Sequence, residues 1–393
     1  MIKTKVIKKD GTLQEWNPNK IKNAVNKACN RCMVCFSDED FKKVINMVEN
    51  NIEEIDSIEV EKLHNMVESV LQSYNSKVAT TYMEYRNYKI DFVGMLDEVY
   101  NKAQKIMYLG DKDNANTDST LVTTQRSLIY NELNKELYNK FFLNSEERQA
   151  CRDGYIYIHD KSARRDTMNC CLFDTKTVMT NGFEMGNMWY NEPNSIDTAC
   201  DVLGDIIMMS ASMQYGGWSS RVDDLLAPYV EKSYNKYKKE ITEDISGMVE
   251  CKIDEEYVHM KALNKARRDL EQGIQGLEYK LNSVASSRGD YPFVTFAIGL
   301  DNSIFGKMVS ETVLKVRREG QGKEGFKKPV LFPKIVFLYD ENLHGEGKEL
   351  EDLFDNAILC SSKAMYPDYL SLTGKGYVPS IYKEYGEVIY PMG

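Results

Sequence analysis

The sequence predicts an α/β protein with a smaller α+β unit at its N-terminus. Two apolar runs, residues 292–298 and 334–339, are typical of strands buried on both faces of a parallel sheet. An amphipathic helix over about 303–319 lies between them and completes a β-α-β unit. The first 92 residues differ, because a short β-hairpin is followed there by helices. We therefore expect two folded parts, the second being a barrel or an open sheet.

Length and composition exclude several classes of protein. A chain of 393 residues favours two or three domains. The 50 Lys and Arg against 60 Asp and Glu leave a net charge of −10, which argues against a surface that coats nucleic acid. The sequence shows neither a membrane-length apolar run nor the apolar core of a secretory signal. Nine cysteines, an odd number, favour a reducing compartment, so we expect a cytoplasmic protein without direct membrane or nucleic-acid binding.

The first 92 residues are expected to fold as one unit. Strands are predicted over 5–8 and 13–16, and Asp10-Gly11 between them supplies the positive φ of a hairpin turn. Asn17 and Pro18 provide the N-cap and the first position of the next helix. Further helices are predicted to open at Ser37 and near Ser57, and a fourth to carry Tyr82, Tyr85 and Arg86.

A linker over 93–117 is expected to join this unit to a second domain over 118–393. The reason is that residues 110–119 are polar and rich in turn-forming types. Beyond the linker, strands alternate with helices. Strands are predicted over 154–159 and 170–173, a helix capped by Asn194 and Ser195, and a long amphipathic helix over about 254–286.

Three lysines near the N-terminus are candidate phosphate ligands. Lys8, Lys9 and Lys20 cluster around a helix N-terminus, whose free N–H groups suit a triphosphate. A solvated lysine-rich surface is the more frequent reason for such a cluster. Charge pattern alone leaves both interpretations open.

Two other motifs favour structural roles. Cys29, Cys32 and Cys35 are spaced like metal ligands, but no nearby Cys or His completes a four-ligand zinc site, so no metal site is predicted. Residues 320–325 spell G-x-G-x-x-G. A helix precedes this motif and a strand follows it, which reverses the order of a dinucleotide-binding fingerprint and predicts a flexible connection instead.

A pair of adjacent cysteines, Cys170 and Cys171, follows a predicted strand that ends in His159. A cysteine nucleophile requires a base within hydrogen-bond reach, and His159 is the candidate for that role. The sequence indicates no third residue that would orient this base. A core position is the alternative, because free cysteine is among the most buried residue types.

Two resemblances to known protein families favour the functional interpretations of the lysines and of the cysteine pair. The order of hairpin, Asn-Pro helix start and later helices over residues 1–92 resembles the ATP-cone, the regulatory nucleotide-binding domain of many ribonucleotide reductases. The rest of the chain resembles the catalytic chain of the anaerobic, class III ribonucleoside-triphosphate reductases. The matching strings are GYIYIHD at 154–160, NCCLFD at 169–174, MTNGFEMGN at 179–187, QYGG at 214–217, LAPY at 226–229, PFVTF at 292–296, FPKIV at 332–336 and YPD at 366–368.

The resemblance implies a fold and a set of site residues. The fold is an ATP-cone followed by the first half of a ten-stranded α/β glycyl-radical barrel built from two five-stranded halves. In this family the cysteine of Asn-Cys-x-Leu lies on the first barrel strand, which makes Cys170 the hydrogen donor to the ribose. Strand alternation then points Cys171 to the opposite face. Substrate contacts are expected from Asn169, Tyr215, Gly216 and Gly217, and ATP or dATP contacts from Lys8, Lys9 and Lys20.

Two departures from the family pattern concern the C-terminus. The glycyl-radical segment and the four-cysteine zinc site of the family are absent, and both are expected in a missing C-terminal part. The sequence ends in Pro-Met-Gly393, a string that the thiyl-radical cysteine follows in relatives. We therefore expect a fragment that is inactive alone and needs its C-terminal half. We expect either an inserted intein or intron, or a separate C-terminal chain that begins with the cysteine.

The implied activity is anaerobic reduction of ribonucleoside triphosphates to deoxyribonucleotides for DNA synthesis. The implied partners are formate as reductant, a radical-SAM activase, the C-terminal half and a second copy in a homodimer. A non-catalytic nucleotide sensor, with a cone on a barrel remnant, is the first alternative. An oxygen- or cobalamin-dependent reductase is the second, against which the Asn-Cys-x-Leu and Tyr-Gly-Gly strings argue.

Overall fold

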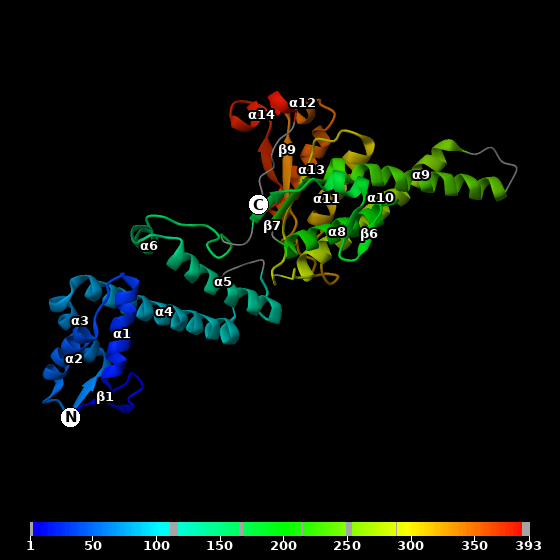
Figure 1. Cartoon of the computed structure of the whole chain (residues 1–393). Coiled ribbons are helices and arrows are strands. Elements are labelled where there is room, and N and C mark those ends of the chain that lie inside the picture. The colour runs from blue at the N-terminus through cyan, green and yellow to red at the C-terminus, as the bar shows by residue number, and fades with distance from the viewer. Residues whose placement is uncertain are drawn as a thin grey trace. The chain divides into compact units, whose positions relative to one another are not determined.

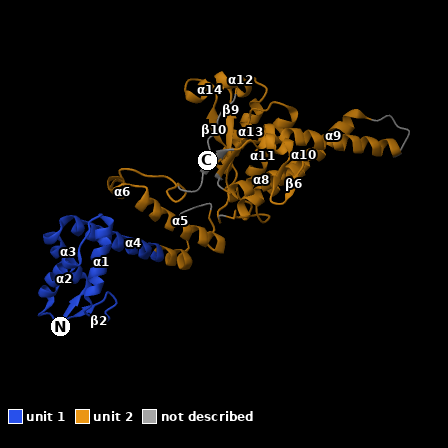
Figure 2. Ribbon diagram, viewed as in Figure 1, with its two compact units in different colours: residues 1–101 blue, residues 102–393 orange. Residues whose placement is uncertain are grey.

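A computed structural model describes residues 3–110, 117–164, 168–213, 215–248, 254–287 and 289–386, with the backbone alone at 168–172, 215 and 216. The chain divides into two compact units, residues 1–101 and 102–393 (Figure 2). Helix α4 (Ser76–Leu109) begins in the first unit and continues into the second. The limits at 92 and 118 expected from composition stay predictions.

The first unit contains a three-stranded sheet in the order β2-β1-β3. Strand β1 (Lys5–Ile7) is antiparallel to β2 (Leu13–Glu15) and parallel to β3 (Ser57–Glu59). Helices α1 (Pro18–Arg31), α2 (Asp38–Ile52) and α3 (Val60–Tyr74) pack with α4 on an aliphatic core. That core has its own set of buried residues, among them Val25, Val48, Ile52, Val67 and Leu71.

Local start signals of two helices are confirmed. The Asn17 side chain accepts a hydrogen bond from the Asn19 N–H, and Ser37 forms a capping box with Asp40. The predicted helix start near Ser57 is wrong. Residues 57–59 form β3 instead, because Ile58 pairs with Val6 and enters the core, and α3 begins only at Val60.

The second unit is built on a five-stranded parallel sheet in the order β10-β9-β8-β7-β4 (Figure 1). Its strands are β4 (Met168–Leu172), β7 (Tyr215–Arg221), β8 (Phe293–Ile298), β9 (Lys334–Tyr339) and β10 (Asp368–Ser371). The longer helices are α5 (Val122–Phe141), α8 (Ile196–Ser212), α9 (Val222–Met248), α10 (Glu255–Ser283), α11 (Ile304–Glu319) and α13 (Glu351–Ala364). Shorter elements are α6 (Ser145–Arg152), α7 (Thr175–Asn181), the hairpin β5 (Phe183–Met185) and β6 (Met188–Tyr190), α12 (Glu341–His344) and α14 (Tyr377–Tyr385).

This sheet confirms the predicted α/β class and the β8-α11-β9 unit. Five parallel strands are also the number expected for half of a ten-stranded barrel. The strand predicted over 154–159 is wrong: that segment is irregular, and Tyr155 and Tyr157 are 84% and 87% exposed. An apolar-polar alternation forms a strand only where a neighbouring strand accepts its backbone hydrogen bonds, and no strand of the described residues pairs with this segment.

The two faces of the sheet have different neighbours. One face, here called the helix face, carries Trp218, Val294, Phe296, Ile335 and Phe337, which pack in one core with residues of α8, α9, α10, α11 and α13. The other carries Ala297, Val336 and Leu338, which pack with Val378 and Tyr382 of α14. Because side chains alternate along each strand, neighbouring residues belong to different cores.

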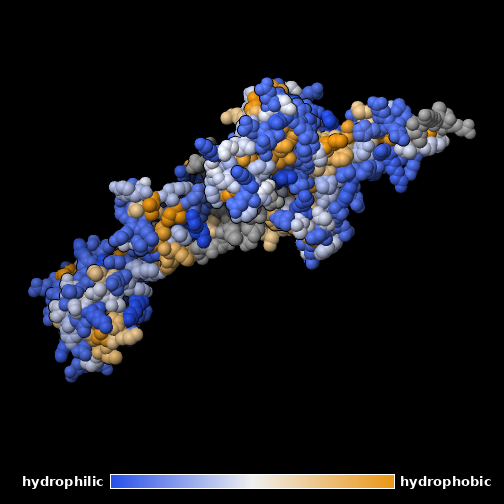
Figure 3. Space-filling model, turned by 90° about the horizontal axis from the view of Figure 1, so that it is seen from above, coloured by the Kyte–Doolittle hydropathy of each residue, from blue (hydrophilic) through white to orange (hydrophobic). Residues whose placement is uncertain are grey.

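The surface of the described residues is mainly hydrophilic, with several separate hydrophobic patches on the face seen in Figure 3. Large apolar side chains that remain exposed include Phe141 at 56%, Phe142 at 60% and Trp189 at 60%. None of the helices in the described ranges combines the length and the apolar character that a membrane crossing requires.

Candidate functional site

The N-terminal hairpin positions the predicted phosphate-binding lysines. The Lys8 N–H donates to Thr12 O at 2.8 Å and the Gly11 N–H to Lys8 O at 2.9 Å, with φ of 81° at Gly11. Lys20 lies in the first turn of α1, and its Nζ donates to Gln14 Oε1 of β2 at 2.7 Å. The hairpin and the helix start are therefore tied together. Lys9 and Lys20 are exposed and Lys8 is half-buried.

A histidine that the sequence interpretation missed lies within electrostatic reach of Lys9. His64 of α3 makes a 2.7 Å hydrogen bond between Nδ1 and the Tyr82 hydroxyl of α4. Burial lowers the pKa of His64, and the positive charges of Arg86, Lys89 and Lys9 lower it further. Cations of the hairpin and of α4 thus act on this histidine of α3. A single histidine on a helix gives no sequence signal for this, because the elements meet only in the folded unit.

The three cysteines of the first unit have separate environments. Cys29 is buried, and burial raises the pKa of its thiol to about 11. Cys32 follows the last turn of α1, with its Sγ 3.5 Å from Cys29 O, and Cys35 is exposed. In the part of the chain that the structure describes, no three His, Cys, Asp or Glu side chains are grouped as metal ligands.

The predicted catalytic cysteine lies on the strand at one edge of the sheet. Strand β4 pairs in parallel with β7, and the register places Cys170 opposite Gly217 and Cys171 opposite Trp218. Trp218 is 2% exposed in the helix-face core, where its ring meets Phe296 edge-on at 6.1 Å. Register partners share a face of the sheet, so the position of Cys171 lies on the helix face with Trp218. Because successive strand residues alternate, the position of Cys170 lies on the other face, here called the cysteine face.

The same alternation divides the predicted substrate residues. Tyr215 pairs with Met168, which puts the positions of Tyr215, Gly217 and Cys170 on the cysteine face. The positions of Asn169 and Gly216 fall on the helix face. The roles of all these residues remain predictions.

Next to Cys170, the cysteine face carries small or polar residues that the sequence interpretation did not single out. Ser219 of β7 is paired with Thr295 of β8, and they are 1% and 0% exposed. The Ser219 hydroxyl has no hydrogen-bond partner among the described residues. The signal in the sequence is the alternation of small with large residues along β7 and β8, which becomes informative only when the register is known.

A buried carboxylate joins the carboxyl ends of β7 and β8. Asp223 accepts hydrogen bonds from three successive backbone N–H groups, those of Gly299, Leu300 and Asp301, at 2.9, 3.0 and 3.1 Å. Arg221 Nε lies 3.2 Å from the other carboxylate oxygen. Burial raises the pKa of Asp223, while Arg221 and the N–H donors oppose that rise. The carboxyl end of a parallel sheet, where α/β proteins bind ligands, is therefore held rigidly.

A histidine extends this network to β9 and α14. The Nε2 atom of His344 lies 2.8 Å from Gly299 O, and its Nδ1 lies 3.0 Å from both the N and the O of Asp340. Burial lowers the pKa of His344, which favours the neutral ring, while the hydrogen bonds to the two carbonyl oxygens oppose this. The Tyr382 hydroxyl donates to Asp340 Oδ2 at 3.2 Å and so fixes α14 to the same edge.

His159, the candidate base, lies in the irregular segment before β4. Its side chain is 74% exposed, and its Nδ1 atom contacts the carboxylate of the adjacent Asp160. Arg164 Nε donates to its carbonyl oxygen at 3.2 Å. Both contacts are local, and the role of His159 as a base stays a prediction.

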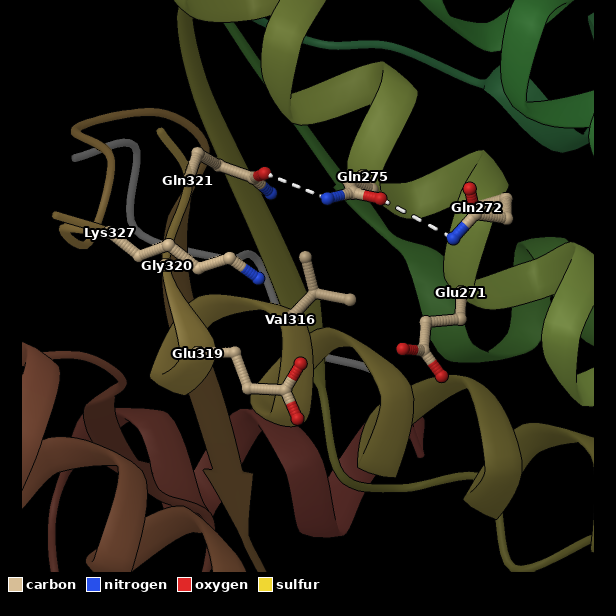
Figure 4. A pocket seen from close by; sticks show the side chains of 8 residues that line it. All are labelled: Glu271, Gln272, Gln275, Val316, Glu319, Gly320, Gln321 and Lys327. Carbon is tan, nitrogen blue, oxygen red and sulfur yellow. Dashed lines mark hydrogen bonds between the residues drawn. The ribbon is translucent and has the colours of Figure 1, made fainter. Parts of the chain in front are cut away.

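A polar pocket lies between α10, α11 and the connection that carries the G-x-G-x-x-G string (Figure 4). Gly320 ends α11 with φ of 71°, and Gln321 forms an antiparallel bridge with Lys328, so the motif is a loop, as predicted. Gln275 Nε2 donates to Gln321 Oε1 at 3.2 Å across the pocket. The lining contains none of the predicted site residues. It is formed by Glu271, Gln272, Gln275, Val316, Glu319, Gly320, Gln321 and Lys327.

Two family models match the chain. The model described as anaerobic ribonucleoside-triphosphate reductase matches residues 113–393, and the ATP cone domain matches residues 4–90. The anaerobic ribonucleoside-triphosphate reductase of Escherichia coli (strain K12) is 32% identical over 380 residues, which cover 93% of this chain and 51% of the relative. That of Enterobacteria phage T4 is 34% identical over 268 residues, or 66% of this chain and 42% of the relative.

A crystal structure of the anaerobic ribonucleotide reductase from Thermotoga maritima in complex with dATP and CTP aligns at a TM-score of 0.38 and 12% identity, covering 92% of this chain and 50% of that one. A structural similarity of this size is too low to bear on the fold. The chain spans about half the length of the Escherichia coli relative. The match over residues 113–393 shows that the chain belongs to the anaerobic ribonucleoside-triphosphate reductase family.

Proposed function

We propose that this chain supplies the effector-binding domain and the first half of the catalytic barrel of an enzyme that reduces ribonucleoside triphosphates to deoxyribonucleotides. The observation that carries the proposal is the position of Cys170. It lies on the first strand of a five-stranded parallel sheet, within a chain of the reductase family, and its register partner is Gly217.

Cys170 donates a hydrogen to the ribose while the 2′-hydroxyl is lost. Gly217 opposite it permits close approach of a ligand to the backbone, because glycine has no Cβ. The small neighbours Ser219 and Thr295 extend the same face, and Asp223 keeps the strand ends in place. The C-terminal half contributes the glycyl radical, the thiyl-radical cysteine and the zinc site.

The complete enzyme is proposed to use formate as reductant, a radical-SAM activase and a second copy of the chain. The family match supports this proposal, since the chain covers 51% of its Escherichia coli relative.

The Cys170 assignment is tested by two single substitutions in the complete reductase, activated anaerobically. Cys170→Ser should lower deoxynucleotide formation below detection, because serine cannot replace the thiol as hydrogen donor, while substrate binding is retained. Cys171→Ser is the matched control and should keep activity within about a few-fold, since its register partner Trp218 lies in the helix-face core. Equal loss of activity in both variants would contradict the assignment.

The first unit is proposed to bind ATP and dATP through Lys8, Lys9 and Lys20. The match to the ATP cone domain supports nucleotide binding by this unit. The hydrogen bond from Lys20 to Gln14 ties the hairpin to the N-terminus of α1, where backbone N–H groups and the helix dipole favour phosphate.

Calorimetry with ATP and with dATP on the 393-residue chain tests this assignment. Combined Lys8→Ala and Lys20→Ala should weaken binding at least about tenfold, because a charge-assisted hydrogen bond contributes about 1.5–3 kcal/mol. Lys42→Ala with Lys43→Ala, two exposed lysines of α2, makes the same change in net charge and should leave the affinity unchanged. Undiminished binding in the first variant would rule out these phosphate contacts.

A further inference from the structure

The first turn of α5 is packed against the connection between α10 and β8. Thr124 is 1% exposed, and its hydroxyl donates to Gly289 O. Gly289 has a φ of 86°, and a Cβ at that position would lie 2.5 Å from Thr124 Cα. Thr117, just before α5, forms an antiparallel bridge with Asp290 of the same connection. The contact is therefore close enough to require glycine at position 289. Two interactions hold it, the Thr124 hydrogen bond and the Thr117 bridge.

The same connection is also tied to the end of α8. The Ser287 N–H donates to Ser212 Oγ at 3.0 Å, and Ser287 Oγ donates to Ser212 O at 3.3 Å. Ser212 is the last residue of α8, and β7 begins three residues later at Tyr215. The connection is therefore bonded to α8 close to the start of the strand that carries the candidate substrate residues.

Internal hydrogen bonds join Ser286, Gly289 and Asp290 of the connection. The Ser286 N–H donates to Asp290 O at 2.7 Å, and Ser286 Oγ donates to Asp290 Oδ1 at 2.6 Å. The Gly289 N–H donates to Ser286 O at 2.9 Å. The contact with α5 and the contact with α8 therefore belong to one body, which leads directly into β8 at Phe293, the register partner of Gly217.

On its other side, α5 is joined to α4. Lys102 Nζ of α4 lies 3.0 Å from Glu132 Oε2 and 3.4 Å from Glu136 Oε1 of α5, and both carboxylates are 17% exposed. The same helix, α4, carries Tyr82 and Arg86 in the first unit. Ion pairs of Lys102 thus link α4 to α5, and the Thr124 hydrogen bond links α5 to the connection between α10 and β8.

We propose that Thr124 and Ser212 are positioning residues that couple nucleotide binding in the first unit to the start of β7. A change in α4 on nucleotide binding shifts α5, Thr124 shifts the α10–β8 connection, and Ser212 carries the shift to Tyr215–Gly217. This inference rests on the proposed binding of ATP or dATP to the first unit. Coupling of this kind requires contacts that can adopt two arrangements, and hydrogen exchange can detect these.

The test is hydrogen–deuterium exchange on the 393-residue chain, alone and saturated with ATP or dATP, with saturation verified by calorimetry. At least one nucleotide should change exchange rates about fivefold or more in peptides covering 284–292 and 211–219, the lower end of typical coupling between sites. Thr124→Val removes the hydroxyl at nearly constant shape and should reduce the change in both peptides below about twofold. Thr124→Ser should preserve it, and Thr123→Val, on the exposed neighbour, is the matched control.

Ser212→Ala determines the order of the route and decides the test if Thr124→Val does not fold. It should abolish the response at 211–219 and retain the response at 284–292. Nucleotide binding without any change at 284–292, or a Thr124→Val or Ser212→Ala variant that responds like the unmodified chain, overturns the inference and leaves the binding assignment intact. Absence of calorimetric binding overturns the binding assignment and the inference with it.

Discussion

The helix face and the cysteine face of the five-stranded sheet differ in the size of their side chains where β7 pairs with β8. The helix face presents Trp218, Phe296 and Phe337, each at most 2% exposed, to several helices. The cysteine face presents Gly217, Ser219 and Thr295 between these positions, and apolar residues such as Val336 and Leu338 only farther along the sheet. The two sets alternate along the same strands, so a single backbone supports a large apolar core on one face and a smaller one, beside small or polar residues, on the other.

This difference indicates which face contributes most to stability. Aromatic side chains on the helix face bury large apolar areas, which is the main favourable contribution to folding. Small residues on the cysteine face bury much less apolar area. Substitutions on the helix face should therefore affect chiefly stability.

The largest expected effect on stability comes from Phe296→Ala on the helix face. Loss of a fully buried aromatic ring beside Trp218 should lower the free energy of unfolding by about 3–5 kcal/mol, because a cavity is left behind. Urea denaturation followed by near-UV circular dichroism measures the loss. The adjacent Thr295→Ala, on the cysteine face, should cost about 0.5–1.5 kcal/mol. Equal losses of unfolding free energy in Phe296→Ala and Thr295→Ala would contradict the difference between the two faces.

A smaller effect is expected when a large side chain is added to the cysteine face. Ala297 packs there against Leu338 and Leu372, next to α14. Ala297→Leu should lower the free energy of unfolding by about 1–3 kcal/mol, because extra methyl groups force neighbours out of their preferred positions. An unchanged urea midpoint would show that this end of the face has spare room.

The smallest effect is expected from Tyr382→Phe in α14. The variant loses the hydrogen bond to Asp340 Oδ2, which should cost about 0.5–1.5 kcal/mol and speed amide exchange in residues 377–385. Tyr385→Phe, on the same helix and 68% exposed, is the matched control and should change neither quantity. Similar exchange in both variants would show that the Tyr382 hydroxyl does not hold α14.

Much of the local structure could be predicted from the sequence because its causes lie within a few residues. Asn17-Pro18 and Ser37 with Asp40 cap helices through neighbouring backbone groups, and both are seen. The apolar runs of β8 and β9 identify buried parallel strands without reference to any partner. Strings such as Asn-Cys-x-Leu identify the family. The failures over 57–59 and 154–159 have one reason, because a short strand exists only where another strand pairs with it.

The sequence by itself therefore determined the α/β class, the starts of α1 and α2, the buried strands β8 and β9 and the family. Only the tertiary structure decided which residues share a surface. The register of β4 on β7 puts Cys170 with Gly217, and the packing of α3 on α4 puts His64 against Tyr82. The fold likewise brings Asp223 to the N–H groups of Gly299–Asp301, 76 to 78 residues away. Such contacts depend on how distant elements pack, and hydrophobic periodicity carries no information about which partner an element meets.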